Sequence, residues 1–178
     1  MSLFAFGEYS PQHGYAILDE RVMRGSAGLM LLVGVVAFIY GFVIKTYAVL
    51  PYLAGFLVLN FALGLFVNPK LSPTVALARL FTFRQSPLPI GAIQKKFALS
   101  LGLTLSTAIF VLSLLLVRDA SWFEAVCMLC LTCLLFLFLE TAFGICVGCQ
   151  IYFLAIRVGL IKRPPVPPNC TGGSCPPA

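Results

Sequence analysis

Two cysteines near the end of the chain, Cys146 and Cys149, stand three residues apart in the segment ETAFGICVGCQIY, residues 140–152. At this spacing both sulfur atoms lie on one side of a helix. Two such thiols can form a dithiol site, hold a persulfide or bind a soft cation. Gly144 and Gly148 expose backbone beside them and leave room for a partner. The alternative is plain packing, because free cysteine is also a comfortable small apolar residue in a membrane helix.

Glu140 precedes this pair and is the only charged residue between positions 125 and 156. A carboxylate inside a membrane-spanning segment is costly, which favours a functional role. We expect it to exchange protons with the two thiols, so Glu140, Cys146 and Cys149 are the candidate catalytic residues. The alternatives are a hydrogen bond to the third helix, at Ser100, Thr104 or Thr107, and an ion pair with Arg79 or Lys96.

The tail carries a second pair, Cys170 and Cys175, in the segment CTGGSC. If this pair lies on the same side of the membrane as Cys146 and Cys149, the intervening chain is long enough for four thiols to meet. Four thiolates suit zinc and fewer can hold copper(I), so these cysteines are a candidate soft-metal site. They equally suit stepwise thiol exchange, in which the tail pair relays cargo to a cytoplasmic acceptor protein.

A third group, Cys127, Cys130 and Cys133, repeats every three residues and resembles part of a ferredoxin-type cysteine run. The position of the fourth cysteine in such a run is Leu137, and the chain has no CxxCH motif. We therefore expect neither an iron–sulfur cluster nor haem. The three thiols are assigned to packing or to redox chemistry.

The composition indicates the class of protein fold that must position these residues. The chain has 178 residues, of which 60% are hydrophobic and only 10% are charged, and its mean hydropathy is +1.01. Soluble domains carry about 25% charged residues. The sequence therefore predicts an all-α integral membrane protein whose main partner is the lipid bilayer.

Four long apolar segments predict four transmembrane helices, since a spanning helix needs about 20 apolar residues. They are residues 25–44, 46–69, 97–117 and 125–156. The fourth segment is too long for one perpendicular span, so it tilts, bends near Phe143 and Gly144, or continues into the interface. The third helix is expected to begin after Lys95 and Lys96.

Lysine and arginine fall almost entirely on one side of these segments, with Lys45 and Arg118 as the exceptions. The positive-inside rule then places both termini and the central connection in the cytoplasm, in a protein of the cytoplasmic (inner) membrane. This topology explains the net charge of +6, so nucleic acid is not an expected partner.

The chain is expected to divide into a cytoplasmic lead, a four-helix membrane domain and a proline-rich cytoplasmic tail, at residues 1–24, 25–161 and 162–178. In the central connection, Ser72 as N-cap and Pro73 as first helical residue predict a short helix, interfacial or re-entrant. Asn60, inside the second span, is expected to hydrogen-bond a neighbouring helix.

Several stretches resemble a bacterial membrane family called domain of unknown function 4395, over roughly residues 17–152. They are ILDERVMRGSAGL, NPKLSP, QKKFA and LETAFGICVGCQIY. The resemblance implies a four-helix membrane protein with no settled activity, associated with sulfur and thiol-redox partners. It singles out Arg24, Asn68, Pro73, Glu140, Cys146 and Cys149. The triple cysteine and the first fifteen residues are additions of this sequence.

These observations favour a membrane protein that handles a thiol-reactive species, either sulfane sulfur or a soft metal ion, at Cys146 and Cys149. A second hypothesis is an accessory structural subunit of a larger membrane complex, with the cysteines as filler. A third is a transmembrane thiol–disulfide electron carrier. That carrier would need something to bridge about 20 Å between Cys133 and Cys146 unless the helix breaks sharply.

Overall fold

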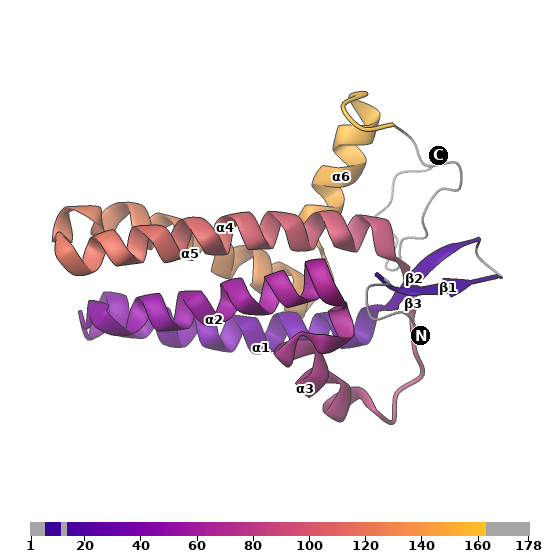
Figure 1. Ribbon diagram of the computed structural model, residues 1–178, viewed down its shortest axis with the longest axis horizontal. Helices are drawn as coiled ribbons and strands as arrows, with labels where there is room; N and C mark the ends of the chain where they lie inside the picture. Colours follow the sequence, from indigo (N-terminus) through magenta and orange to yellow (C-terminus); the bar gives the residue numbers. More distant parts are fainter. Residues whose placement is uncertain (1–5, 12–13, 163–178) are drawn as a thin grey trace.

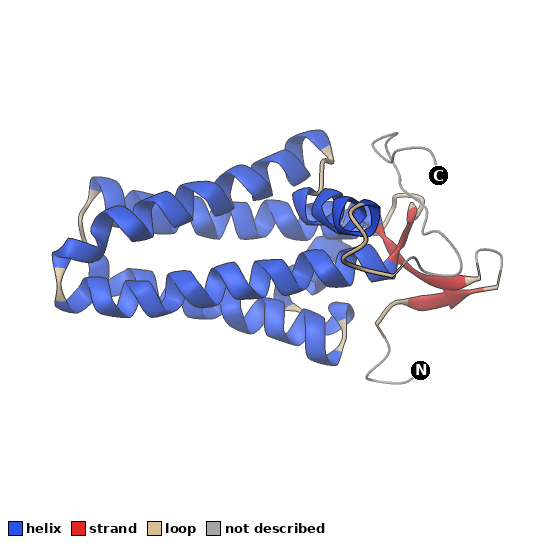
Figure 2. Cartoon of the chain, turned by 90° about the horizontal axis from the view of Figure 1, so that it is seen from above, coloured by secondary structure: helices blue, strands red, loops and turns tan. Residues whose placement is uncertain are grey.

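Four long helical segments run side by side in the computed structural model, which describes residues 6–11 and 14–162 (Figures 1 and 2). Each is long and apolar enough to cross a membrane, with a mean hydropathy between 2.0 and 2.3. They span Glu20–Val43, Tyr47–Val67, Ala92–Arg118 and Ala120–Phe143. The expectation of a mostly helical chain with four such helices is confirmed.

The first two segments are α-helices that end in a π-helical turn. α1 (Glu20–Phe38) continues into Ile39–Val43, and α2 (Leu50–Ala62) continues into Leu63–Val67. A 3-10 turn, Tyr47–Val49, precedes α2.

The third segment is α4 (Ala92–Arg118), which is continuous. It begins several residues earlier than expected, so the prediction that the third helix starts after Lys95 and Lys96 is wrong. Both lysines lie in its first turns. A lysine can start a membrane helix because its long stem is apolar and its charged end finds a partner.

The fourth segment breaks where the residue pattern allowed a bend. α5 (Phe123–Phe138) continues into the π-helical turn Leu139–Phe143, and Gly144 then takes a left-handed conformation with φ 71°. The chain restarts as α6 (Val147–Arg157), which stands across the axis of the bundle in Figure 1. Among the three alternatives for residues 125–156, the bend near Gly144 is confirmed.

A small antiparallel sheet lies at the end of the bundle from which α6 projects (Figures 1 and 2). Its strands, in spatial order, are β1 (Glu8–Ser10), β2 (Tyr15–Asp19) and β3 (Pro89–Gly91). The sequence predicted helices alone, so these three short strands were not expected. β2 needs β3, more than 70 residues away, as its pairing partner: Ile17 lies opposite Gly91.

Asp19 links the sheet to the bundle. It is the N-cap of α1, and its carboxylate accepts hydrogen bonds from the backbone N–H of Arg21 at 3.1 Å and of Leu88 at 3.2 Å. The N–H of Glu20 also donates to the carbonyl of Leu88 at 2.9 Å. The start of α1 is thus fixed to the segment that leads into α4.

The central connection contains α3 (Pro73–Thr82), which packs on α1. Ser72 holds the N-cap position, but its hydroxyl donates to Asn60 Oδ1 at 2.7 Å instead of capping α3. The same oxygen accepts from the backbone N–H of Thr74 at 3.1 Å and from its hydroxyl at 3.0 Å. Asn60 therefore bonds across helices, as expected. The placement of α3 at or in a membrane surface stays a prediction.

Candidate functional site

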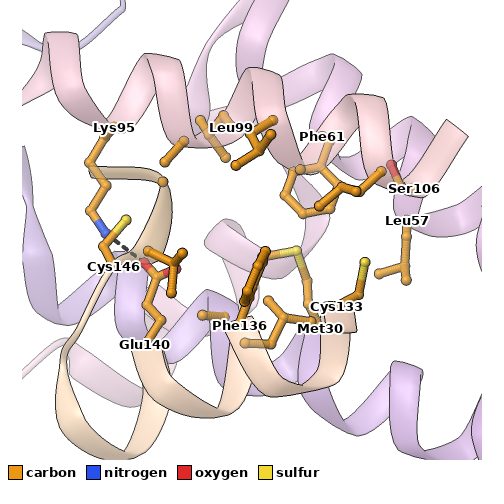
Figure 3. Close-up of a pocket in the computed structure, with 18 of the residues that line it drawn as sticks. Met30, Leu57, Phe61, Lys95, Leu99, Ser106, Cys133, Phe136, Glu140 and Cys146 are labelled. Atoms are coloured by element: carbon orange, nitrogen blue, oxygen red, sulfur yellow. Dashed lines mark hydrogen bonds and ion pairs between the residues drawn. The ribbon is translucent and has the colours of Figure 1, made fainter. Parts of the chain in front are cut away.

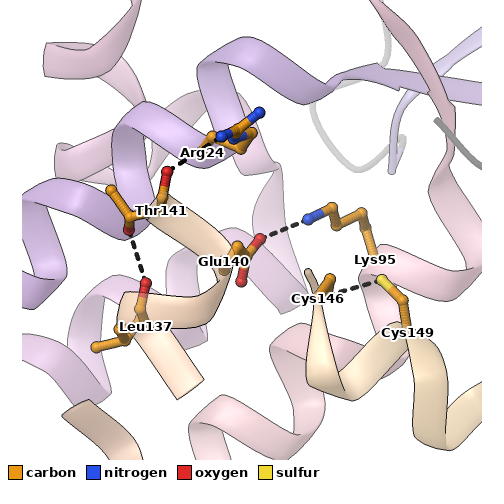
Figure 4. A network of polar contacts seen from close by, with 7 residues as sticks. All are labelled: Arg24, Lys95, Leu137, Glu140, Thr141, Cys146 and Cys149. Carbon is orange, nitrogen blue, oxygen red and sulfur yellow. Dashed lines mark hydrogen bonds and ion pairs between the residues drawn. The ribbon is translucent and has the colours of Figure 1, made fainter. Parts of the chain in front are cut away.

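The cysteine pair occupies the first turn of α6. Cys146 is the N-cap residue and Cys149 follows one turn later, and their sulfur atoms are 2.7 Å apart (Figure 4). Both residues are buried, with exposed fractions of 8% and 7%, and both thiols are free. The unpaired backbone N–H groups at a helix start favour negative charge, so this position suits a thiolate.

The two thiols differ in acidity because one donates to the other. The Cys149 thiol donates a hydrogen bond to the Cys146 sulfur, which lowers the pKa of Cys146 below that of an ordinary thiol. The ammonium group of Lys95 acts in the same direction, while burial and Glu140 oppose it. The same hydrogen bond, together with burial, raises the pKa of Cys149. Cys146 is therefore the more acidic thiol of the pair, and the one that ionises first.

Glu140 forms an ion pair with Lys95, whose Nζ lies 2.5 Å from Glu140 Oε1. The Lys95 side chain is 3% exposed and that of Glu140 is 20% exposed. The structure thus shows an ion pair, which was one of the alternatives for Glu140, but the partner is Lys95 and not Arg79 or Lys96, because α4 begins early enough to bring Lys95 to the bend after α5. The hydroxyls of Ser100 and Thr104 instead donate to carbonyls of their own helix, at 2.7 and 3.0 Å.

Arg24 of α1 contacts the bend between α5 and α6. Its guanidinium donates to the carbonyl of Thr141 at 3.1 Å, and it packs directly on Gly144. A Cβ at Gly144 would lie 3.1 Å from Arg24 Nη1, in a backbone conformation that L side chains rarely adopt. In the charge pattern, Arg24 was only one of the basic residues that set the membrane orientation. The family resemblance, in contrast, singled out Arg24 as a candidate site residue. In the structure, Arg24 hydrogen-bonds the backbone of the π-helical turn that carries Glu140 (Figure 4).

Gly148 determines how closely α6 approaches α4. A Cβ at this position would lie 2.7 Å from the Cα of Ala98, so only glycine fits without a backbone shift. One turn later, the rings of Tyr152 and Phe97 pack with centroids 5.7 Å apart. The room that Gly148 makes is thus filled by α4, and this contact places the cysteine pair beside Lys95.

A cavity of about 110 Å³ extends from this site into the bundle (Figure 3). Lys95, Glu140 and Cys146 line one end, and Cys133 of α5 lines it farther along. Cys133 and Cys146 therefore line the same cavity, because the helix is interrupted between them at Gly144.

The other two cysteines of α5 lie apart from the cavity lining. Cys130 packs against a cluster formed by Leu50, Leu116 and Val126, and both it and Cys127 are free thiols. This apolar environment agrees with a packing role for Cys130. A redox role for the three α5 cysteines stays a prediction.

Cys170 and Cys175 lie outside the described residues, so the four-thiol metal site and the tail relay stay predictions. Within residues 6–11 and 14–162, no group of three or more histidine, cysteine or acidic side chains is arranged to hold a metal ion.

Comparison with known proteins adds one finding. Residues 18–157 match the family described as Domain of unknown function (DUF4395). The chain belongs to this family. The matched DUF4395 region runs from β2 to the last residue of α6, and it includes Arg24, Lys95, Glu140 and the cysteine pair. No curated protein and no solved structure matches the chain.

Proposed function

We propose that this DUF4395 protein is a membrane thiol-redox protein in which Cys146 and Cys149 alternate between dithiol and disulfide. Its substrates are thiol-reactive sulfur compounds, either disulfides or sulfane sulfur, and the corresponding thiols in the reverse direction. The single observation that carries this proposal is the 2.7 Å separation of the two sulfur atoms at the start of α6.

The proposed reaction depends on the different acidities of the two thiols. The Cys146 thiolate attacks one sulfur of the substrate, the substrate S–S bond breaks, and the departing sulfur leaves as a thiolate. Cys149 then loses its proton and attacks the Cys146 sulfur, which releases the second substrate fragment as a thiol. The two cysteines have lost two electrons and hold one disulfide, and the substrate has gained those electrons.

The ion pair supplies positive charge and a proton path beside the nucleophile. Lys95 stabilises the Cys146 thiolate through charge, and Glu140 accepts or returns the proton that moves when Cys149 reacts. The tail cysteines, Cys170 and Cys175, are proposed as the relay to a cytoplasmic thiol protein. The cytoplasmic membrane, with both termini inside, is proposed from the distribution of lysine and arginine.

Trapping of a mixed disulfide tests the proposal. In Cys149→Ser the second attack is impossible, so a disulfide substrate or polysulfide should remain bound to Cys146, where peptide mass spectrometry detects the added mass. Cys130→Ser is the matched control and should return to the free or disulfide form. An untouched Cys146 in Cys149→Ser would contradict the proposal.

Metal analysis and purification of the native protein distinguish the alternatives. Zinc or copper(I) retained by the native protein and lost in Cys146→Ser would favour the metal site and contradict thiol exchange. Stoichiometric co-purification with a larger complex, with full function after all cysteines are alkylated, would favour the accessory-subunit role.

A further inference from the structure

The cavity behind Cys146 is small, and only one of the two thiols borders it. Its volume is about 110 Å³, and its lining includes Cys146 but not Cys149 (Figure 3). A cavity of about 150 Å³ holds a benzene ring, whereas about 10–15 Å³ is enough for one water molecule. The space behind Cys146 therefore fits a chain of a few heavy atoms, and it is too small for a substituted ring or a peptide.

The lining of the cavity favours a group that needs no hydrogen bonds. Beyond the Lys95–Glu140 ion pair the lining is apolar, except for its two cysteines and Ser106. The Ser106 hydroxyl already donates to the carbonyl of Leu103 at 3.1 Å. A group rich in oxygen or nitrogen would lose its hydrogen bonds to water on entering, which is costly. A divalent sulfur atom is only a weak hydrogen-bond acceptor, so it loses little there.

Cys149 contacts the Cys146 sulfur from outside the cavity. It lies one turn later in α6, and the two sulfur atoms are 2.7 Å apart. A small group bound to the Cys146 sulfur can thus extend into the cavity while Cys149 stays beside the same sulfur. In thiol exchange the attacking and departing sulfur atoms lie on opposite sides of the sulfur under attack. The cavity gives the departing atom a place that Cys149 does not occupy.

We infer that Cys146 carries a persulfide, Cys146–S–SH, whose outer sulfur lies in the cavity, and that the substrate is the sulfane sulfur of small inorganic polysulfides. This inference rests on the proposed function, since it requires Cys146 to attack a substrate S–S bond and Cys149 to resolve the product. Of the two substrate classes of that function, only sulfane sulfur leaves a fragment small enough for the cavity. An organic disulfide such as oxidised glutathione leaves a whole tripeptide on Cys146.

The reaction balances in atoms, charge and electrons. The Cys146 thiolate attacks one sulfur of hydrogen disulfide, HSSH, the substrate S–S bond breaks, and hydrosulfide, HS⁻, leaves with the negative charge. The persulfide that remains on Cys146 is neutral, so the cavity receives no charge. Cys149 then attacks the Cys146 sulfur, and the outer SH group leaves with the Cys149 proton as H₂S. The two cysteines lose two electrons and form one disulfide, and the substrate gains these electrons. A cytoplasmic thiol protein then reduces the disulfide.

A persulfide trapped in Cys149→Ser tests the inference. The reduced protein in detergent is mixed without oxygen with sodium disulfide, Na₂S₂, at neutral pH. Peptide mass spectrometry after alkylation then measures the fraction of Cys146 that carries one extra sulfur atom. We expect this persulfide to accumulate in Cys149→Ser. In the native protein we expect the Cys146–Cys149 disulfide and released sulfide instead.

A filled cavity and a matched surface change separate this site from general thiol reactivity. Leu137 lines the cavity, and Leu137→Trp in the Cys149→Ser background should slow persulfide formation about tenfold or more, because the indole takes the space of the added sulfur. Leu135→Trp in the same background, at a residue of the same helix that is 53% exposed, should react like its parent. Oxidised glutathione, whose fragment stays outside the cavity, should form a mixed disulfide with Cys146 at equal rates in both variants, which shows that the site is folded.

The outcomes distinguish the two proposals. If oxidised glutathione modifies Cys146 in Cys149→Ser but sodium disulfide leaves no persulfide there, the persulfide site is wrong and the dithiol proposal stands. Equal rates of persulfide formation in the two tryptophan variants would also overturn the persulfide site. The same holds if Leu137→Trp slows both reagents alike. If neither reagent modifies Cys146, the proposed function itself fails.

Discussion

Cys146 and Cys149 are neighbours in one turn of helix, yet they have different chemistry because the hydrogen bond between them has a direction. Cys149 donates and Cys146 accepts at 2.7 Å, so the acceptor is favoured as the thiolate. The spacing of the pair predicted sulfur atoms on one side of a helix. It did not reveal which sulfur ionises, because that depends on which thiol donates to the other, and this follows from the conformation of the chain at the start of α6.

Removal of the donor should raise the pKa of Cys146. A hydrogen bond to a charged group contributes about 1.5–3 kcal/mol, which corresponds to about one to two pH units. In Cys149→Ala the pH midpoint for alkylation of Cys146 by iodoacetamide should therefore move upward by about that much. Cys149→Ser keeps a hydroxyl donor and should show a smaller upward shift. An unchanged midpoint in Cys149→Ala would contradict the assigned hydrogen bond.

Lys95 and Glu140 should depend on each other for stability. Lys95→Met leaves the carboxylate unpaired, which should cost about 3 kcal/mol, the lower end for buried pairs because Glu140 is 20% exposed. The double variant Lys95→Met/Glu140→Leu removes both charges and should recover most of this loss. Thermal unfolding in detergent measures the effect. A Lys95→Met protein that melts like the native one would show that the pair adds nothing.

At the scale of elements, the decisive feature is the break between α5 and α6. The composition predicted the helices, and the excessive length of residues 125–156 with Gly144 in its interior indicated a bend. An ion pair of Glu140 was one of the alternatives, but Lys95 was missed as its partner because the contact needs both this bend and the early start of α4. The sheet was missed because strands as short as β1 and β3, three residues each, carry too little pattern to be recognised.

Gly144→Ala should harm the site more than an equivalent change elsewhere. The left-handed backbone alone costs an alanine about 1–2 kcal/mol, and the new Cβ also meets Arg24 at 3.1 Å. Gly159 is the matched control, because it has a similar φ of +83° with nothing within 4 Å. We expect Gly144→Ala to lower the melting temperature further than Gly159→Ala and to change the alkylation rate of Cys146. Equal effects of the two variants would contradict the role of the Arg24 contact.

At the scale of the whole molecule, the sheet and α6 lie toward one end of the bundle, and the cysteine pair lies at that end (Figure 1). The bundle presents apolar side chains outward, as contact with lipid requires, and large exposed ones occur on all four long segments. A sequence pattern can indicate this outward apolarity, because membrane helices must satisfy it along their length. It cannot indicate the cavity, which depends on how the helices pack.

The proposed orientation predicts which positions face each side of the membrane. In a variant without native cysteines, Lys45→Cys should react with a membrane-impermeant maleimide added to intact cells, because residue 45 lies in the predicted outer turn. Gln85→Cys, in the central connection, should react only after the cells are opened. Labelling in the reverse order would contradict the orientation and the cytoplasmic position of the dithiol.

The most direct test of the dithiol is a redox titration in native membranes. The membranes are equilibrated with graded mixtures of oxidised and reduced dithiothreitol, and each cysteine is quantified by alkylation and peptide mass spectrometry. We predict that Cys146 and Cys149 lose and regain alkylation together and reversibly, as one two-electron couple, while Cys130 follows no such joint transition. Two thiols that stay alkylatable at every ratio, or that change independently of each other, would contradict the proposal.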